Sequence, residues 1–295
     1  MTQPSKDEIK KGIEESGYLL EQRICPVLDK SGFAVFPNEH YKDPDTGKSR
    51  EIDVYAVDLI PLYRDSFDDT VSLSLLIECK NNHTPVVFFS QRNDLEGAYA
   101  PIKICGMPEC VHDARNDWGV AVQDFFRFRV FHHYYSAKWV STQFCQLTRK
   151  SDKGRWSASH EKLHESVESL VKATDFLTKR RSEHVSSQPE VHDEIALETL
   201  YPVLLFAGPI YECKIQGRNY RLTKAKHIAL ERDVQSSSIQ GTFRIDVIHE
   251  SYLGRYMKLV IAEKNEMVKR FKRKRLLLKE NVLRESQEKH ERSNG

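Results

Sequence analysis

Two carboxylates and one ammonium group stand at spacings that could support hydrolysis of a phosphodiester bond. Glu78 and Lys80 lie two residues apart at the end of the apolar run VSLSLLIECK, and Asp53 lies in the stretch REIDVYAVD. Carboxylate and main-chain carbonyl oxygens are the ligands that Mg²⁺ prefers, and the ion keeps positions open for water and a phosphate. A lysine beside such an ion can orient or help to deprotonate the attacking water. These residue types predict metal-assisted hydrolysis if the fold brings them together.

The run from residue 71 to residue 80 has the character of a β-strand, which predicts where its charges point. Ile77 and Cys79 are expected to face the core, whereas Glu78 and Lys80 share the opposite face. An isolated Glu-x-Lys triplet is more often a solvated strand end than a catalytic site, so its neighbours decide its meaning.

The stretch REIDVYAVD, residues 50–58, supplies such a neighbour. Its alternation predicts that Asp53 shares a face with Glu51. The opposite face is expected to hold Ile52, Val54 and Ala56. If this strand pairs with the next one, Asp53 converges with Glu78 and Lys80, and a strand carbonyl can join the two carboxylates as a metal ligand.

This ordered set resembles the PD-(D/E)XK nuclease superfamily, with Asp53 as the first acid, Glu78 as the second and Lys80 as the lysine. Members related to archaeal Holliday-junction resolvases and Mrr-type restriction enzymes also carry an acid on an N-terminal helix. Glu21, in GYLLEQRICPVLDKSGFAVF, is the matching residue here. The resemblance extends over roughly residues 10 to 95.

The resemblance implies an α/β fold of the restriction-endonuclease-like type, with a mixed central sheet flanked by helices. It implies a nuclease dependent on Mg²⁺ or Mn²⁺, a hydrolase acting on ester bonds, with DNA as the substrate. Asp53, Glu78 and the carbonyl of Cys79 would bind the metal, Lys80 would act on the water, and Glu21 would support the metal or a second ion. The alternative is a catalytically inactive nuclease-like module that binds nucleic acid or protein.

Two features near the motif need separate mention. Ile52 stands where the motif name has proline, and the adjacent Glu51 could be mistaken for the motif acid. Related enzymes often carry a glutamine on the element after the lysine strand, and Gln91 in VVFFSQ is the candidate here.

The rest of the chain divides by composition. Residues 1–181 are expected to form the nuclease-like domain, and 182–193 a polar, proline-containing linker. Residues 194–295 are expected to form an additional C-terminal α/β region, either separate or packed with the first domain. Periodicity predicts helices over 7–30, 119–136, 156–181 and 251–271, strands over 86–91, 141–149 and 242–250, and a hairpin turning at Gly217.

A basic segment ends the C-terminal region. The net charge of the chain is only +2, so contact with nucleic acid must be local. The segment VKRFKRKRLLLK, 268–279, is either a solvated helix face or an arm for the phosphate backbone. Its candidate nucleic-acid-binding residues are Lys269, Arg270, Lys272, Arg273, Lys274 and Arg275.

Other candidate sites have weaker support. The tetrapeptide YECK repeats the Glu-x-Lys spacing at Glu212 and Lys214, followed by Asp246 in FRIDV. The order is reversed and no helix acid is matched, so Glu212 and Lys214 are expected to be exposed charges, with Cys213 and Ile215 facing a core, rather than a second site. His132 and His133 are expected to take separate core and surface roles, because adjacent residues do not share a helix face.

The cysteines are relevant to a possible zinc site and to the cellular compartment of the protein. Cys105, Cys110 and His112 could form a zinc-organised scaffold, but their spacing fits no common zinc finger. The six cysteines are scattered, the first residues are polar, and no run approaches the roughly 20 apolar residues of a membrane helix. A cytoplasmic protein is expected, and a second copy or a partner protein is left open.

Overall fold

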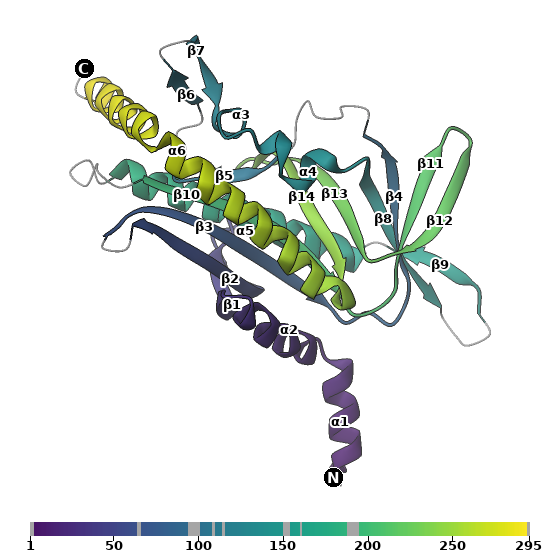
Figure 1. The fold of residues 1–295 in the computed structure, drawn as a ribbon. Coiled ribbons are helices and arrows are strands. Elements are labelled where there is room, and N and C mark those ends of the chain that lie inside the picture. Colours follow the sequence, from purple (N-terminus) through teal and green to yellow (C-terminus); the bar gives the residue numbers. More distant parts are fainter. Residues whose placement is uncertain are drawn as a thin grey trace.

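A large mixed β-sheet forms the centre of the molecule, and helices lie on its faces (Figure 1). The computed structural model describes the chain except for residues 1–2, 64–65, 94–100, 108–109, 114–115, 150–153, 160, 188–194 and 294–295. Within these limits the sheet has 12 strands, and its main path runs β1-β2-β3-β10-β14-β13-β8-β4-β11-β12. The expectation of an α/β fold with a mixed sheet flanked by helices is confirmed.

Two helices precede the sheet where the sequence predicted one over 7–30. The first is α1 (Lys6–Glu15) and the second is α2 (Tyr18–Lys30). The Asn81 side chain donates hydrogen bonds to the carbonyls of Glu14 (2.7 Å) and Ser16 (3.1 Å), next to the break. The apolar periodicity is that of α2, whose Leu20, Ile24 and Leu28 are buried, whereas α1 buries none of its residues.

An antiparallel meander follows α2, formed by β1 (Ala34–Lys42), β2 (Ser49–Tyr63) and β3 (Ser66–Lys80). Val54 lies opposite Ile77, so the next residues outward are Asp53 on β2 and Glu78 on β3. The two strands predicted to be neighbours are therefore neighbours.

The orientation of the β2 side chains departs from the prediction at one residue, Ile52. Val54 and Ala56 pack in one hydrophobic cluster with α2, whereas Ile52 packs in the other with Tyr55. On the paired strand, Asn38 has a left-handed backbone (φ 55°) between the partners of Ile52 and Val54. Simple alternation does not anticipate this irregularity, and Asp53 lies beside it.

The second half of the chain returns to the same sheet. After α5 (Glu161–Ser187), strand β10 (Ile195–Phe206) runs parallel to β3, with Leu204 opposite Glu78 and Phe206 opposite Lys80. On its other side β10 pairs with β14 (Gln240–His249). The regions 1–181 and 194–295 thus share one sheet.

The predicted linker is partly wrong. Residues 182–187 continue helix α5, because neither glycine nor proline interrupts the chain before Pro189. The rest of the linker, 188–193, lies outside the described residues.

The remaining strands extend the sheet beyond β14, except β5, which pairs with β10. They are β4 (Val86–Arg92), β5 (Lys103–Cys105), β8 (Trp139–Arg149), β9 (Trp156–Ser159), β11 (Ile210–Gln216), β12 (Asn219–Ala225) and β13 (His227–Gln235). The expected strands at β4 and β8 and the hairpin of β11 and β12 are confirmed, and Gly217 has φ 62° at the turn. Strand β13 was not predicted.

The helix predicted over 119–136 is wrong. This region contains the end of the hairpin β6 (Cys110–Asp113) and β7 (Asn116–Ala121), then α3 (Val122–Phe125), a 3₁₀ turn and α4 (His133–Ser136). Arg127 has a left-handed backbone (φ 56°), which ends the short helix α3. The aromatic residues that suggested one amphipathic helix instead fold inward from several short elements.

Different helices cover the two faces of the sheet (Figure 1). Helix α5 packs with Leu76 and Tyr55, whereas α2 and the long helix α6 (Leu253–Ser293) pack with Ile77 and Cys79. The buried face of α6 has helical spacing, with Tyr256, Val260, Met267, Phe271 and Leu278. β3, which carries the Glu-x-Lys triplet, is therefore covered on both faces.

Candidate functional site

Asp53, Glu78 and Lys80 lie at neighbouring positions on β2 and β3. The Oδ2 atom of Asp53 accepts a hydrogen bond of 2.7 Å from the main-chain N–H of Cys79. The Nζ atom of Lys80 lies 3.3 Å from Oε2 of Glu78. Strand pairing thus places two carboxylates and one ammonium group together at the end of β3.

Glu21 enters the same group from the first turn of α2 and is 8% exposed. Burial raises its pKa, and the nearby carboxylates of Asp53 and Glu51 raise it further, while Lys80 opposes the shift. Glu21 is thus close enough to Asp53, Glu51 and Lys80 to interact with them electrostatically. We call Glu21, Asp53, Glu78 and Lys80 the acidic site.

The acidic site holds more negative than positive charge. Burial and the Asp53 carboxylate raise the pKa of Glu78 to about 7, against the opposing effect of Lys80. Burial also raises the pKa of Asp53, although the Cys79 N–H and Lys80 oppose the shift. Buried or partly buried carboxylates that share one lysine favour a bound cation, and their oxygen atoms suit Mg²⁺ or Mn²⁺. The residues present therefore fit the metal that the resemblance implies.

Two residues that the sequence did not single out support Glu78. Ser169 on α5 donates a hydrogen bond of 3.3 Å to Oε1 of Glu78. The hydroxyl of Tyr41 on β1 lies 3.1 Å from the Oγ atom of Ser169. A single serine on the inner face of a helix carries no recognisable motif, so only the packing of α5 on β3 reveals this contact.

The carboxylates of the acidic site do not close around a single point. In the described part of the chain, groups of three His, Cys, Asp or Glu ligand atoms within 4.8 Å of one another occur outside the acidic site. Glu21, Asp53 and Glu78 do not form such a group. An ion held here by Asp53 and Glu78 would need main-chain oxygen, such as the carbonyl of Cys79, and water to complete its coordination.

The structure does not bring Gln91 to the acidic site. Gln91 is exposed on β4, and strands β10, β14, β13 and β8 separate β4 from β3 in the sheet order. Although β4 follows β3 in the sequence, the two strands are thus not neighbours in the sheet.

The six basic candidates of α6 differ in their surroundings. Arg270 donates a 2.9 Å hydrogen bond to the carbonyl of Phe126, Lys274 donates to the carbonyl of Phe125, and Arg275 pairs with the buried Asp69. These three hold α6 against the rest of the molecule. The other three, Lys269, Lys272 and Arg273, are exposed. Lys269 pairs with Glu266 of the same helix at 3.6 Å.

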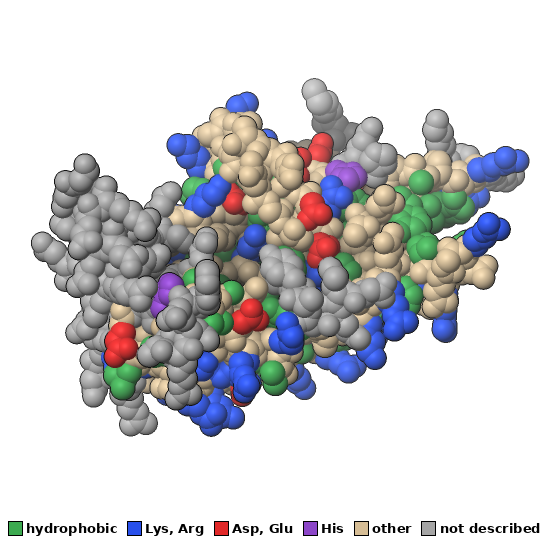
Figure 2. All heavy atoms as spheres, turned by 90° about the horizontal axis from the view of Figure 1, so that it is seen from above, with side chains coloured by type: hydrophobic (Ala, Val, Ile, Leu, Met, Phe, Trp, Pro, Cys, Tyr) green, Lys and Arg blue, Asp and Glu red, His purple; other side chains and the backbone are tan. Residues whose placement is uncertain are grey.

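The described residues on the face seen in Figure 2 form no single basic patch. Lys and Arg side chains occupy several separate places on this face, among uncharged and acidic side chains. This distribution agrees with a net charge of only +2.

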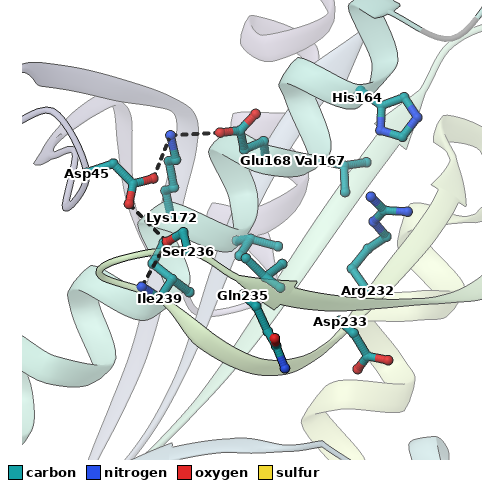
Figure 3. A pocket seen from close by; sticks show the side chains of 12 residues that line it. Asp45, His164, Val167, Glu168, Lys172, Arg232, Asp233, Gln235, Ser236 and Ile239 are labelled. Atoms are coloured by element: carbon teal, nitrogen blue, oxygen red, sulfur yellow. Dashed lines mark hydrogen bonds and ion pairs between the residues drawn. The ribbon is translucent and has the colours of Figure 1, made fainter.

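A pocket of about 270 Å³ lies between α5 and β13 (Figure 3). Its lysine, Lys172, has three carboxylate partners: Asp43 at 3.4 Å, Asp45 at 3.2 Å and Glu168 at 2.8 Å. These acids balance the charge of Lys172, so this lysine does not offer a free positive charge to the pocket. None of the four residues of the acidic site lines it.

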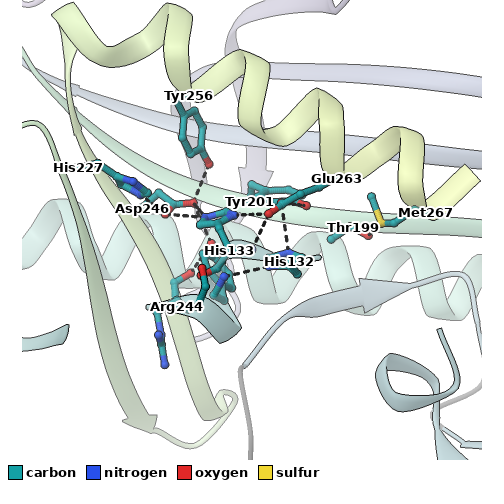
Figure 4. Close-up of polar contacts among 12 residues, drawn as sticks. His132, His133, Thr199, Tyr201, His227, Arg244, Asp246, Tyr256, Glu263 and Met267 are labelled. Carbon is teal, nitrogen blue, oxygen red and sulfur yellow. Dashed lines mark hydrogen bonds and ion pairs between the residues drawn. The ribbon is translucent and has the colours of Figure 1, made fainter. Parts of the chain in front are cut away.

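A second polar cluster lies under α6 and was not predicted (Figure 4). The rings of His132 and His133 are stacked, 5.0 Å apart at 10°, and both face Glu263. The expectation of separate core and surface roles is wrong, because the chain is not helical through both residues: His132 is the extended cap residue of α4.

Asp246 occupies the centre of this cluster and is fully buried. Its Oδ1 lies 3.0 Å from Nε2 of His133 and 2.7 Å from Nε2 of His227. Its Oδ2 accepts hydrogen bonds from the hydroxyls of Tyr256 (2.7 Å) and Tyr134 (3.2 Å). Both oxygens of this buried carboxylate therefore have partners.

Electrostatics couple the members of this cluster. Burial alone would raise the pKa of Asp246, but His133 and His227 hold it well below its usual range. Burial acts to lower the pKa of His133, and Asp246 and Glu263 more than offset it, raising the value to about 10. Burial lowers the pKa of His132 to about 4. The adjacent histidines thus have opposite charge preferences.

The remaining alternatives do not assemble. Glu212 pairs with Lys214 at 3.3 Å on β11, and strands β4, β8 and β13 separate them from Asp246 on β14. Cys213 is buried, whereas Ile215 is 37% exposed. In the described chain Cys105, Cys110 and His112 do not form a ligand group, since Cys105 is buried beside Glu198 and Cys110 is exposed.

None of the described helices is long and apolar enough to cross a membrane. The chain matches no protein-family model, and comparisons with curated proteins and with solved structures gave no significant match.

Proposed function

We propose that the protein is a metal-dependent nuclease that hydrolyses phosphodiester bonds, with DNA as its substrate. The observation that carries the proposal is the placement of Asp53, Glu78 and Lys80 on paired strands, with Asp53 tied to the N–H of Cys79. Oxygen ligands beside one lysine are the groups that hydrolysis of a phosphodiester needs.

The resemblance to PD-(D/E)XK nucleases supports the proposal through the order of the elements. Helix α2 with Glu21, strand β1, strand β2 with Asp53 and strand β3 with Glu78 and Lys80 follow one another as the resemblance implies. A restriction-endonuclease-like fold is part of the proposal.

In this proposal Asp53, Glu78 and the Cys79 carbonyl hold Mg²⁺ or Mn²⁺, which supplies positive charge to the phosphate in the transition state. Lys80 orients the water that attacks phosphorus. Ser169 holds the carboxylate of Glu78 by a 3.3 Å hydrogen bond, and Glu21 adds negative charge on the side of α2. The exposed Lys269, Lys272 and Arg273 contribute contacts to the phosphate backbone.

A second candidate function is nucleic-acid or protein binding without cleavage. It is favoured by one observation: Glu21, Asp53 and Glu78 are not gathered around one point in the described structure, and Lys80 is paired with Glu78. In that case the acidic site is a remnant that no longer binds an ion.

Cleavage assays decide between the two functions. Purified protein is incubated with plasmid, linear duplex, single-stranded DNA and RNA, in Mg²⁺, in Mn²⁺ and in EDTA. We expect metal-dependent cleavage of DNA that Asp53→Ala and Lys80→Ala abolish. The matched controls are Glu212→Ala and Lys214→Ala, which change the same triplet on β11 and should leave cleavage intact.

The outcomes separate the alternatives. Cleavage that survives both Asp53→Ala and Lys80→Ala would reject the assignment of the site. Binding of nucleic acid without cleavage in either metal would favour the binding module.

A further inference from the structure

Three ligand atoms converge beneath α6, on elements that are far apart in the sequence. They are Nε2 of His133 at the start of α4, Nε2 of His227 at the start of β13 and Oδ1 of Asp246 on β14, and they lie within 4.8 Å of one another. We propose that these residues form a metal site, separate from the acidic site, which binds one divalent first-row transition-metal ion such as Zn²⁺.

The spacing of the ligand atoms is close to that around one ion. The two imidazole nitrogens lie 3.0 Å and 2.7 Å from Oδ1 of Asp246. Ligands at about 2.0–2.1 Å from a metal lie roughly 3.0–3.4 Å from one another. The two nitrogen-to-oxygen distances are therefore within a few tenths of an ångström of this range, and the two nitrogens lie within 4.8 Å of each other.

Further contacts present the correct ligand atoms. Glu263 lies 2.8 Å from Nδ1 of His133, so this nitrogen donates to the carboxylate and Nε2 is left for the metal. Tyr256 donates to Oδ2 of Asp246, and Nε2 of His133 lies 3.0 Å from Oδ1 and 3.1 Å from Oδ2, so Oδ1 is the oxygen that both imidazoles approach. Carboxylate and hydroxyl partners of this kind fix the orientation of metal ligands in proteins.

Access to the site is from the side of His227. Its side chain is 22% exposed, whereas those of His133 and Asp246 are 10% and 0% exposed. An ion can thus enter past His227 and keep water on that side. The neighbouring grouping of His132, His133 and Glu263 is enclosed, and Nδ1 of His132 already accepts from the N–H of Tyr134.

The ligand types indicate the class of ion. Two imidazoles and one carboxylate suit Zn²⁺, Fe²⁺ and related ions, whereas Mg²⁺ and Ca²⁺ prefer oxygen ligands alone. The acidic site has oxygen ligands, so the two sites differ in the metal they prefer. The inference does not depend on the proposed nuclease activity.

The rival explanation is a network of hydrogen bonds alone, in which a charged His133 bridges Asp246 and Glu263. Metal binding tells the two apart. Full-length protein is stripped with chelator, dialysed and titrated with Zn²⁺ at pH 7.5, in competition with a chromophoric chelator. His227→Ala removes one ligand at a partly exposed position, His249→Ala is the matched control at the partly exposed end of β14, and Asp53→Ala removes the acidic site.

We expect one tight Zn²⁺ equivalent in the wild type, in His249→Ala and in Asp53→Ala. His227→Ala should bind at least about 100-fold more weakly, because the loss of a direct ligand exceeds the 10–100-fold effect of losing a supporting contact. Thermal unfolding in EDTA checks that the variants are folded. Substituting His227→Cys keeps a metal ligand, so Co²⁺ binding should persist with a new thiolate-to-cobalt absorption band.

Several results would overturn the proposal. One is a wild type that binds no tight Zn²⁺, which leaves the hydrogen-bond network. Another is equal binding by wild type and His227→Ala, and a third is binding that disappears in Cys110→Ser but not in His227→Ala. Failure of the cleavage assays leaves this result unaffected, because Zn²⁺ binding is read directly.

Discussion

The carboxylate of Asp53 accepts a hydrogen bond of 2.7 Å from the main-chain N–H of Cys79, the residue between Glu78 and Lys80. One side chain of β2 is thereby fixed to the centre of the Glu-x-Lys triplet on β3. The bond leaves Oδ1 of Asp53 for another partner. Changes around this contact are expected to affect stability and cleavage in distinguishable ways.

Replacement of Ser169 tests whether α5 positions the acidic site. Ser169→Ala removes the hydrogen bond to Oε1 of Glu78, and we expect the cleavage rate to fall roughly fivefold, equivalent to about 1 kcal/mol. Ser169→Thr keeps a hydroxyl group and should retain most of the rate. Equal rates in all three proteins would show that this contact does not orient Glu78.

The free energy of unfolding of the metal-free protein should depend on pH through the ionisation of Glu78. Burial and Asp53 raise its pKa from 4.5 to about 7, so the folded state binds the proton more tightly than the unfolded state. The stability contributed by Glu78 is therefore present below pH 4.5 and is lost as the pH rises to about 7. The loss is at most about 3 kcal/mol.

Substituting Glu78→Gln removes this ionisation. Urea unfolding in EDTA should show that Glu78→Gln gains stability relative to the wild type between pH 5 and pH 8. Glu212→Gln on β11 is the control and should follow the wild type. If the stabilities of wild type and Glu78→Gln change in parallel with pH, the raised pKa of Glu78 is refuted.

The hydroxyl of Tyr256 should stabilise the fold through Asp246. Tyr256→Phe removes a 2.7 Å hydrogen bond to a fully buried carboxylate, and we expect a loss of about 1.5–3 kcal/mol in the free energy of unfolding. Tyr220→Phe changes a 70% exposed tyrosine and should alter stability by less than about 0.5 kcal/mol. Chemical denaturation of the metal-free proteins measures both values, and a neutral Tyr256→Phe would contradict this role.

The basic residues of α6 should divide into structural and surface groups. Arg275 pairs with Asp69, which is 0% exposed, so Arg275→Ala leaves a buried charge unpaired and should cost about 3 kcal/mol of stability. The double variant Lys272→Ala, Arg273→Ala should retain full stability. It should instead weaken DNA binding and reduce its salt dependence.

Fluorescence anisotropy at several salt concentrations, together with urea unfolding, checks both halves of this prediction. DNA affinity unchanged by the double variant would exclude the exposed part of α6 from the nucleic-acid interface. An Arg275→Ala protein as stable as the wild type would show that Asp69 finds another partner.

Local sequence determined much of the acidic site. Strand character over 71–80 and 50–58 was enough to predict paired strands with Asp53 beside Glu78 and Lys80, because consecutive strands of a meander pair with each other. The family resemblance, rather than spacing, singled out Glu21 on α2. The same reasoning misjudged Ile52, because left-handed Asn38 on the partner strand interrupts the alternation.

The tertiary structure alone decided which distant strands meet. β10 inserts between β3 and β14, and this pairing joins the two halves of the chain in one sheet and leaves β4, with Gln91, far from β3. His133, His227 and Asp246 carry no shared motif and are separated by up to 113 residues. Their convergence depends on non-local strand pairing and on the packing of α6, which local periodicity does not encode.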